Sequence, residues 1–333
     1  MSMNINLKQL HVWVPGMFEF KGGIQVYSSF LLQALQELYP QAKSHDFLKN
    51  DAQATDQAAY LPGTQFHCAG DWSSSLRTPA FAAQLMSQGL LHRPDLIVST
   101  HLNFAIAAQW LKRFAGIPYW VVAHGIEAWN IEHPAIQTAL QDADRILCVS
   151  HYTRDRLLKE QNLDPNKLGI LFNTFNAERF TIAPKPPELL QRYNLHENQP
   201  VILTVSRLCH TELYKGYYKV LEALPKIRQV IPNIHYLLVG KGDDCPRIES
   251  LVKSLELEDC VTLAGYVSDN ELPAYYNLCN VFAMPSQKEG FGIVYLEALA
   301  SGKPVLGGNQ DGAVDALCHG TLGALVNSND VEM

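Results

Sequence analysis

Short apolar runs alternate with longer amphipathic segments along almost the whole chain. The apolar runs are rich in Val, Ile and Leu and are bounded by turn-forming residues, which is typical of buried strands. Strands are expected at Leu10–Val14, Leu96–Ser99, Tyr119–Ala123, Ile146–Val149, Ile170–Phe172, Val201–Val205, His235–Val239, Val261–Ala264 and Val281–Met284, with a further short one at Pro304–Leu306. Because helices separate the strands, the pattern predicts an α/β protein with parallel sheets.

Two helices are indicated most clearly, and each follows a turn that contains glycine. In the segment Ile24–Leu38 the apolar side chains recur every three or four residues, so they share one helix face. The same spacing recurs in Tyr218–Val230. Each of these segments is therefore predicted to cover a sheet with its apolar face.

The length and one proline-rich segment predict the domain organisation. A chain of 333 residues favours two domains over one. Pro184, Pro186 and Pro187 disfavour both a helix interior and a central strand. We therefore expect an N-terminal domain over residues 1–180, a linker over 181–198 and a C-terminal domain over 199–333.

The composition narrows the class of protein. The hydrophobic share of 47% allows a substantial core, and the net charge of −7 argues against a dedicated nucleic-acid binder. The sequence contains neither an apolar run long enough to span a membrane nor a signal-peptide profile at its start, so we expect a cytoplasmic protein. The seven cysteines are scattered and never spaced CxxC, which indicates neither a disulfide framework nor a zinc site.

A pair of cations follows the first strand of the second half. The segment 201–216, VILTVSRLCHTELYKG, leads from a strand into a loop with Arg207 and Lys215 and then to a glycine. Ligands of open α/β sheets bind beyond the carboxyl ends of strands, and an arginine with a lysine suits a diphosphate there. The alternative is a pair of solvated surface cations.

Two carboxylates eight positions apart form a second candidate. The segment 285–304, PSQKEGFGIVYLEALASGKP, predicts a turn at Glu289–Gly292 and a helix that runs through Glu297 and ends at Gly302. Both carboxylates can face one crevice, where they would accept hydrogen bonds from sugar hydroxyls. The alternative is that neither residue binds a ligand: Glu289 would be a charge that the helix dipole favours at the helix N-terminus, and Glu297 a solvated residue of the helix.

The first half carries weaker candidates. Gly22 and Gly23 precede a helix and would open backbone amides towards a ligand, although a simple β–α turn also explains them. His124 and His101 each directly follow a strand, where an imidazole can exchange a hydrogen bond near neutral pH. Ser150 is predicted to be a helix cap. The acidic turn at Asp243 and Asp244 lacks neighbouring histidines, so we expect no metal there.

Several motifs in order resemble a known family. SRLCHTELYKG, LLVGKGDD, LAGYVSDNELPAYY, MPSQKEGFGIVYLEALASGKPV and GNQDGAVDAL together resemble the family 4 retaining glycosyltransferases, whose two Rossmann-like domains face each other across a cleft in the GT-B fold. The E-x7-E pattern of that family maps onto Glu289 and Glu297, and its cations for the donor diphosphate map onto Arg207 and Lys215.

The resemblance implies a role for each candidate residue. Glu289 would contact the transferred sugar, Glu297 the ribose, and His124 the sugar and the acceptor. The remaining donor contacts would come from the glycine-rich loop, the turn into the second helix and the segment beside the base, at Gly22, Gly23, Gly290, Phe291, Gly292, Ile293, Tyr266 and Val267. His124, Arg207, Lys215 and Glu289 would form the catalytic set.

The resemblance also implies a reaction. A hexose would move from a nucleoside-diphosphate sugar to an acceptor hydroxyl with retention, in polysaccharide or glycoconjugate synthesis, without a cofactor or a metal. The acceptor would be a carbohydrate, a small molecule or a lipid-linked glycan, the last bringing peripheral contact with the inner face of the membrane. The alternatives are a sugar-nucleotide epimerase or phosphorylase, and a non-catalytic nucleotide-sugar-binding subunit.

Family members commonly continue for several helices beyond the region that matches GTLGALVNSND. The present chain ends at Met333. On this comparison the C-terminal part is expected to be shortened.

Overall fold

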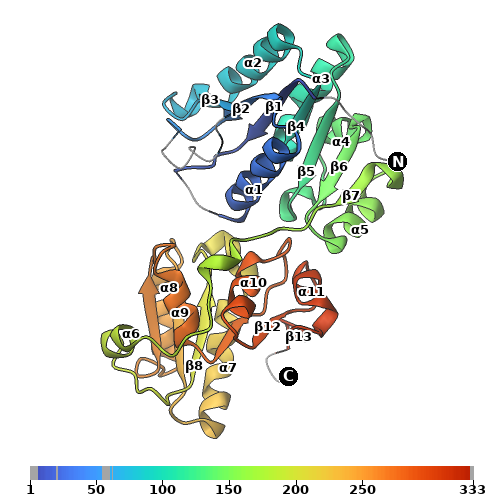
Figure 1. Cartoon of the computed structure of the whole chain (residues 1–333). Helices are drawn as coiled ribbons and strands as arrows, with labels where there is room; N and C mark the ends of the chain where they lie inside the picture. The colour runs from blue at the N-terminus through green and yellow to red at the C-terminus, as the bar shows by residue number, and fades with distance from the viewer. Residues whose placement is uncertain (1–6, 20–21, 55–60, 62, 331–333) are drawn as a thin grey trace. The chain divides into compact units, whose positions relative to one another are not determined.

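The computed structural model describes residues 7–19, 22–54, 61 and 63–330 (Figure 1). The chain divides into two compact units, Met1–Thr174 and Phe175–Met333. The proline-rich segment lies in the second unit and contains a short helix, α6 (Pro187–Arg192). Pro187 occupies the first turn of α6, where the amide that proline lacks has no partner within the helix.

The first unit is built on a parallel sheet. Its strands have the order β3-β2-β1-β4-β5-β6-β7, and every pair is parallel. They are β1 (Gln9–Val14), β2 (Lys43–Leu48), β3 (Thr64–Cys68), β4 (Leu96–Ser99), β5 (Tyr119–Ala123), β6 (Arg145–Cys148) and β7 (Leu168–Ile170). The strands that follow β1 lie on one side of it and those that follow β4 lie on the other, so the loops after β1 and β4 lead away from each other.

Helices connect the strands of this sheet. They are α1 (Gly23–Leu38), α2 (Ser74–His92), α3 (Ala105–Ala115), α4 (Pro134–Asp142) and α5 (His151–Glu160). A buried cluster joins α2, α3 and α4 to one sheet face through Phe81, Leu111 and Leu140, which meet Trp13 and Tyr119. α1 lies on the other face (Figure 1).

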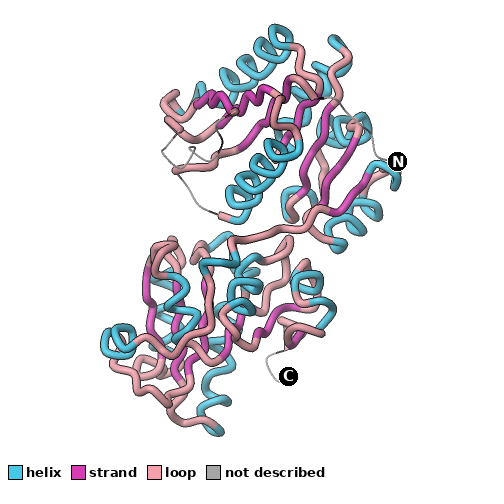
Figure 2. The backbone as a smooth tube through the Cα atoms, viewed as in Figure 1, coloured by secondary structure: helices cyan, strands magenta, loops and turns pink. Residues whose placement is uncertain are grey.

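The second unit again combines strands with helices (Figure 2). Its sheet has the order β10-β9-β8-β11-β12-β13, and every pair is parallel. The strands are β8 (Val201–Val205), β9 (His235–Val239), β10 (Val261–Gly265), β11 (Val281–Met284), β12 (Val305–Gly308) and β13 (Ala324–Val326). The helices are α7 (Tyr217–Val230), α8 (Cys245–Ser254), α9 (Leu272–Leu278), α10 (Ile293–Ala300) and α11 (Ala313–Ala316). α7 and α8 share one buried cluster with the sheet.

The α/β fold class predicted from the apolar runs is confirmed. The strands at 96–99, 119–123, 201–205, 235–239 and 281–284 have the predicted bounds, whereas the run predicted at Ile170–Phe172 pairs two residues earlier, as β7. The expectation missed β2, β3 and β13. β2 (KSHDFL) has polar residues at two buried positions, His45 and Asp46, and β3 (TQFHC) is partly or fully exposed along its length, so both lack the apolar pattern of the other strands.

The described residues include no helix with both the length and the apolar character needed to cross a membrane. All seven cysteines are free thiols.

Candidate functional site

The strand order of the second sheet reverses between β8 and β11, which pair directly. The loops after two such strands lead away from each other, and the crevice between them is the usual ligand site of an open α/β sheet. Arg207 and Lys215 lie in the loop after β8, and Glu289 lies in the loop after β11. The two candidate motifs of the second half therefore meet at one edge of one sheet.

Lys215 and Glu289 form an ion pair across these loops. The Lys215 ammonium donates a hydrogen bond to Oε2 of Glu289, and each side chain is 17% exposed. Burial lowers the pKa of Lys215, but Glu289, Tyr214 and Glu212 together more than offset this, so the pKa is raised and the lysine stays charged. The Gln287 amide also donates to the Tyr214 carbonyl at 2.9 Å, which joins the same loops through the backbone.

Arg207 pairs with a carboxylate of its own loop. Its guanidinium donates to Oε1 of Glu212, which lies in the 3-10 segment His210–Lys215. The Arg207 side chain is 54% exposed and that of Glu212 only 11%. Within the described part of the chain, Oε2 of Glu212 is buried and accepts no hydrogen bond. A mostly buried carboxylate therefore holds a guanidinium that remains accessible to an anion.

Tyr214 shows that these charges belong to one cluster. Burial raises the pKa of its hydroxyl to about 12, and four nearby charges act on it as well. Glu212 and Glu289 raise this pKa, whereas Lys215 and Arg207 lower it. The two predicted cations and the first predicted carboxylate thus lie around a single tyrosine.

The turn at Gly290–Ile293 leads directly into α10. Gly292 has φ of +90°, and a Cβ atom there would lie 2.4 Å from the Tyr295 ring, so the turn requires glycine. The first amides of a helix lack acceptors within it and favour an anion or a polar oxygen. Gly290, Phe291, Gly292 and Ile293 thus bring backbone groups to the loop that carries Glu289.

Glu297 lies further along α10 and is partly buried. Its Oε2 accepts a hydrogen bond of 2.7 Å from the Tyr276 hydroxyl. Burial raises the pKa of Glu297, and the hydrogen bond from Tyr276 and the charge of Arg179 partly offset this. Glu297 is therefore held separately from the Lys215–Glu289 pair, with one oxygen engaged by Tyr276.

Asp311 is a further site residue, outside the set predicted from the sequence. Its fully buried carboxylate lies directly behind the Glu289 turn and accepts a hydrogen bond of 2.7 Å from the Glu289 amide. Burial raises the pKa of Asp311 to about 6. In the sequence, the only local indication of this residue is the Asp311–Gly312 pair. The pair lies in the loop after β12, which is the neighbour of β11 in the sheet.

Val267 follows β10, in the segment expected to lie beside the base. Its neighbour Tyr266 is 66% exposed, and the Lys241 ammonium lies 4.8 Å from the centre of the Tyr266 ring. The segment therefore offers an accessible aromatic surface next to a cation.

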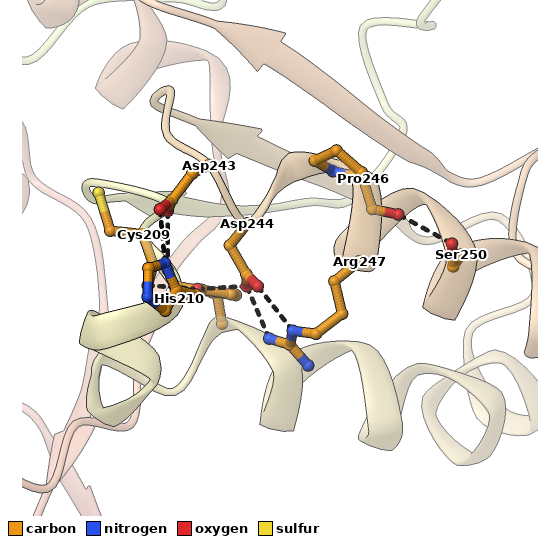
Figure 3. A network of polar contacts seen from close by, with 8 residues as sticks. Cys209, His210, Asp243, Asp244, Pro246, Arg247 and Ser250 are labelled. Atoms are coloured by element: carbon orange, nitrogen blue, oxygen red, sulfur yellow. Dashed lines mark hydrogen bonds and ion pairs between the residues drawn. The ribbon is translucent and has the colours of Figure 1, made fainter.

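The acidic turn after β9 is occupied by partners within the protein (Figure 3). Asp243 accepts hydrogen bonds from the backbone amide and the ring Nδ1 of His210. Asp244 accepts from Nε and Nη2 of Arg247 at 2.7 and 2.6 Å and from the Tyr217 hydroxyl at 2.7 Å. These contacts tie the turn to the loop that carries Arg207.

In the first unit, His124 follows β5 and is 8% exposed. Its Nε2 lies 2.9 Å from the Thr100 carbonyl oxygen, and the Tyr27 ring meets the imidazole edge to face. Burial lowers the pKa of His124 to about 4, so the ring is neutral at pH 7. The His124 amide donates to the Glu127 carboxylate, whose pKa burial raises.

The glycines after β1 lie at the start of α1. Gly22 is its N-cap and Gly23 its first residue, and a Cβ atom on Gly23 would meet nothing within 4 Å. The preceding amides are already engaged, because the buried Asp51 carboxylate accepts from Met17, Phe18 and Glu19 at 2.6, 3.0 and 2.8 Å. Asp51 was not among the residues predicted from the sequence.

His101 and Ser150 were the two remaining candidates of the first unit, and each lies just after a strand. His101 follows β4, and its Nδ1 accepts from the Asn103 amide at 3.2 Å. The Ser150 hydroxyl accepts from the Thr153 amide at 3.0 Å at the start of α5, which confirms the predicted cap.

Family models match both units. Residues 22–179 match the model described as Glycosyltransferase Family 4, and residues 187–333 match Glycosyl transferases group 1. Together the two matches span most of both units.

Curated relatives are similar over part of their length. A GDP-mannose-dependent alpha-(1-6)-phosphatidylinositol monomannoside mannosyltransferase of Mycolicibacterium smegmatis is 33% identical over 67% of this chain. The alpha-D-kanosaminyltransferase of Streptomyces kanamyceticus is 26% identical over 78% of the chain. The aligned regions cover 60% and 62% of these relatives.

Solved structures share the fold. Anabaena HepE in complex with UDP and glucose has a TM-score of 0.77 at 20% identity, over 98% of this chain and 87% of its own. Sucrose-phosphate synthase from Thermosynechococcus elongatus has a TM-score of 0.80 at 22% identity, over 97% and 87%. These likenesses confirm the predicted architecture of two Rossmann-like α/β domains, the GT-B fold.

Proposed function

We propose that this chain, which belongs to the family 4 glycosyltransferases, transfers a hexose from a nucleoside-diphosphate sugar to an acceptor hydroxyl. One observation carries the proposal: Lys215, Glu289, Arg207 and Glu212 gather around Tyr214 at the carboxyl edge of the second sheet. A cation pair for a diphosphate and a carboxylate for sugar hydroxyls are the groups that such a donor requires.

Arg207 and Lys215 hold the donor diphosphate in this proposal. The guanidinium offers a planar fork to the phosphate oxygens, and the ammonium neutralises the charge that develops as the nucleoside diphosphate leaves. Lys215 must then exchange its contact with Glu289 for one with phosphate. This exchange releases the Glu289 carboxylate to accept hydrogen bonds from the hexose.

The carboxylates and the α10 turn hold the two rings of the donor. We assign Glu289 to the hexose, Glu297 to the ribose, and the backbone of Gly290–Ile293 to the sugar and phosphate oxygens. Tyr276 supports this assignment for Glu297, because it occupies one carboxylate oxygen and leaves the other for a hydroxyl. Val267 and its exposed neighbour Tyr266 are assigned to the base.

We assign the acceptor hydroxyl to the first unit, near His124. Because burial lowers the pKa of this imidazole to about 4, the ring acts as a neutral hydrogen-bonding group near pH 7. The start of α1 at Gly22 and Gly23 is assigned to donor or acceptor oxygens. Retention would follow from attack on the same sugar face, with the donor phosphate taking the acceptor proton.

The choice of substrates follows the named relatives. GDP-mannose is the first donor to test and UDP-glucose the second, because relatives and solved neighbours carry these groups in their names. A lipid-linked glycoside is the first acceptor to test, and it would bring the protein to the inner face of the membrane. No metal is assigned a role, because fixed cations and helix amides supply the positive charge.

The test measures nucleoside diphosphate release with GDP-mannose or UDP-glucose and a panel of acceptors. The wild type is expected to release it in an acceptor-dependent way, and the variant Arg207→Ala/Lys215→Ala is expected to lose at least about 100-fold in kcat/KM. Lys253→Ala, on the exposed side of α8, is the matched control. Full turnover by the double variant would overturn the proposal.

Two other outcomes would replace the proposed function. Formation of an epimeric sugar nucleotide without release of nucleoside diphosphate would identify an epimerase. Binding without turnover across the whole panel would identify a binding subunit.

A further inference from the structure

We propose that Asp311 is a positioning residue that fixes Glu289 for recognition of the donor sugar. This inference rests on the proposed function and extends it to a residue outside the recognised cation and carboxylate motifs. Asp311 lies in the loop after β12, whereas Glu289 lies in the loop after β11. Its role is to hold the backbone from which the Glu289 side chain projects.

Asp311 uses both carboxylate oxygens and accepts three hydrogen bonds. Oδ2 accepts from the Ser286 hydroxyl at 2.6 Å and from the Glu289 amide at 2.7 Å. Oδ1 accepts from the Ala313 amide at 3.0 Å, at the start of α11. Because Asp311 is fully buried, water cannot replace these contacts when the carboxylate is removed.

The backbone around Asp311 reinforces the contact with Glu289. The Gly312 amide donates to the Glu289 carbonyl at 2.7 Å, so Glu289 is held at both its N–H and its C=O. A Cβ atom on Gly312 would lie 2.0 Å from the Gly290 carbonyl oxygen, which shows how closely the two loops approach. The Glu289 backbone is thus held from behind.

Ser286 extends the support into the helix that follows. Its hydroxyl lies 2.9 Å from the Tyr295 hydroxyl, which itself donates to the Met284 carbonyl at 2.8 Å. Asp311, Ser286 and Tyr295 therefore connect the end of β11 to α10. The network contacts the Glu289 backbone, whereas the Glu289 side chain forms an ion pair with Lys215.

The first test measures the backbone directly, without any substrate. Hydrogen exchange is compared for peptides covering 286–293 and for the buried strand β9 in the wild type, Asp311→Ala and Asp311→Asn. We expect Asp311→Ala to raise exchange at 286–293 by about tenfold or more and to leave β9 unchanged. Unchanged protection at 286–293 would overturn the proposal, whether or not the chain is a glycosyltransferase.

The second test separates positioning from general damage through donor binding and turnover. With GDP-mannose or UDP-glucose, Asp311→Ala should lower kcat by about 30-fold or more, while the Kd of GDP or UDP alone changes by less than about threefold. Asp311→Asn should lose less, because its amide oxygen can still accept from Glu289. Asp259→Asn, at an exposed turn, is the matched control.

A double-mutant cycle assigns the effect to Glu289. If Asp311 acts through Glu289, the variant Asp311→Ala/Glu289→Gln should be no slower than Glu289→Gln alone. Additive losses, or an equal loss of nucleoside diphosphate binding, would overturn the positioning role. Should Asp311→Ala fail to fold, Asp311→Asn and Ser286→Ala carry the same comparison. Absence of any transfer by the wild type would count against the proposed function alone, and the exchange experiment would still decide the role of Asp311.

Discussion

Lys215 and Glu289 are 74 positions apart in the sequence, yet they form a largely buried ion pair at the edge of the second sheet. In this pair each group satisfies the other, so a bound donor must separate them. The lysine then gains phosphate oxygens and the glutamate gains sugar hydroxyls. Substitution of Lys215 should therefore mainly weaken nucleoside diphosphate binding, whereas substitution of Glu289 should mainly lower turnover.

Glu289→Gln is expected to separate binding from turnover. Removing the carboxylate frees Lys215, so the affinity for GDP or UDP alone should stay the same or rise by a few-fold, while kcat with the sugar nucleotide falls by about 100-fold. Lys215→Met should instead weaken nucleoside diphosphate binding by about tenfold or more. Calorimetry measures the binding and steady-state kinetics the turnover. Identical behaviour of both variants would contradict the separate roles.

Glu212→Gln is expected to act through Arg207. The change removes the negative charge that holds the guanidinium, so the donor KM should rise by about tenfold with a smaller change in kcat. The double variant Glu212→Gln/Arg207→Ala should have nearly the same donor KM as Arg207→Ala alone, because each change removes the same Arg207–Glu212 ion pair. Glu258→Gln, on the exposed surface of the same unit, is the control. A fall in kcat at constant KM would contradict this account.

His124→Asn is expected to lower kcat without changing the pH profile between pH 6 and 8. Burial lowers the pKa of His124 to about 4, so its proton equilibrium lies outside this range. The single N–H of the neutral ring, on Nε2, donates to the Thr100 carbonyl, so Nδ1 is the acceptor. A loss of about 10- to 100-fold in kcat is expected if Nδ1 accepts a hydrogen bond in the transition state. The measurement is kcat/KM from pH 5.5 to 8.5. Disappearance of a limb near pH 6.5 in the variant would show that His124 titrates in the wild type.

Much of the second unit was predictable because its strands are continuous apolar runs that end at the loops carrying Arg207 and Glu289. The order of β8 and β11 in the sheet was not, since strand pairing depends on contacts far apart in the sequence. For the same reason the contact of Asp311 with Glu289 had no local sign beyond an Asp-Gly turn. In the first unit, β2 and β3 escaped prediction because buried His45 and partly buried His67 stand where the other strands have apolar residues.

These histidines lead to a prediction for acid stability. His11, His45, His67 and His92 lie together: Nε2 of His11 is 3.2 Å from Nδ1 of His92, and Nδ1 of His45 is 3.1 Å from Nε2 of His67. Burial, with the neighbouring histidines, lowers the pKa of His11 to about 3 and that of His45 to about 4, and it also lowers the pKa of His67. Lys43 contributes to the shift at His45.

The sign follows from proton binding. Between about pH 6.5 and 4 the unfolded chain binds more protons on these histidines than the folded unit does, so the free energy of unfolding falls as the pH is lowered. The buried Asp46, whose pKa burial raises to about 7, acts in the opposite direction throughout this range. Elsewhere in the first unit burial also lowers the pKa of His124 and His101 and raises that of Glu127. Because the histidines with a lowered pKa outnumber the carboxyls with a raised pKa, we expect the first unit to lose stability below pH 6.5.

Hydrogen exchange of the whole chain is measured at pH 7 and pH 5 and corrected for the intrinsic exchange rates. Peptides from each unit then report the change in stability of that unit separately. Peptides from β1 and β2 should lose protection at pH 5 more than peptides from β8 and β9. His45→Gln should weaken the pH dependence, whereas His133→Gln, at an exposed position of the same unit, should leave it unchanged. An equal loss of protection in both variants and both units would show that the histidine cluster does not govern acid stability.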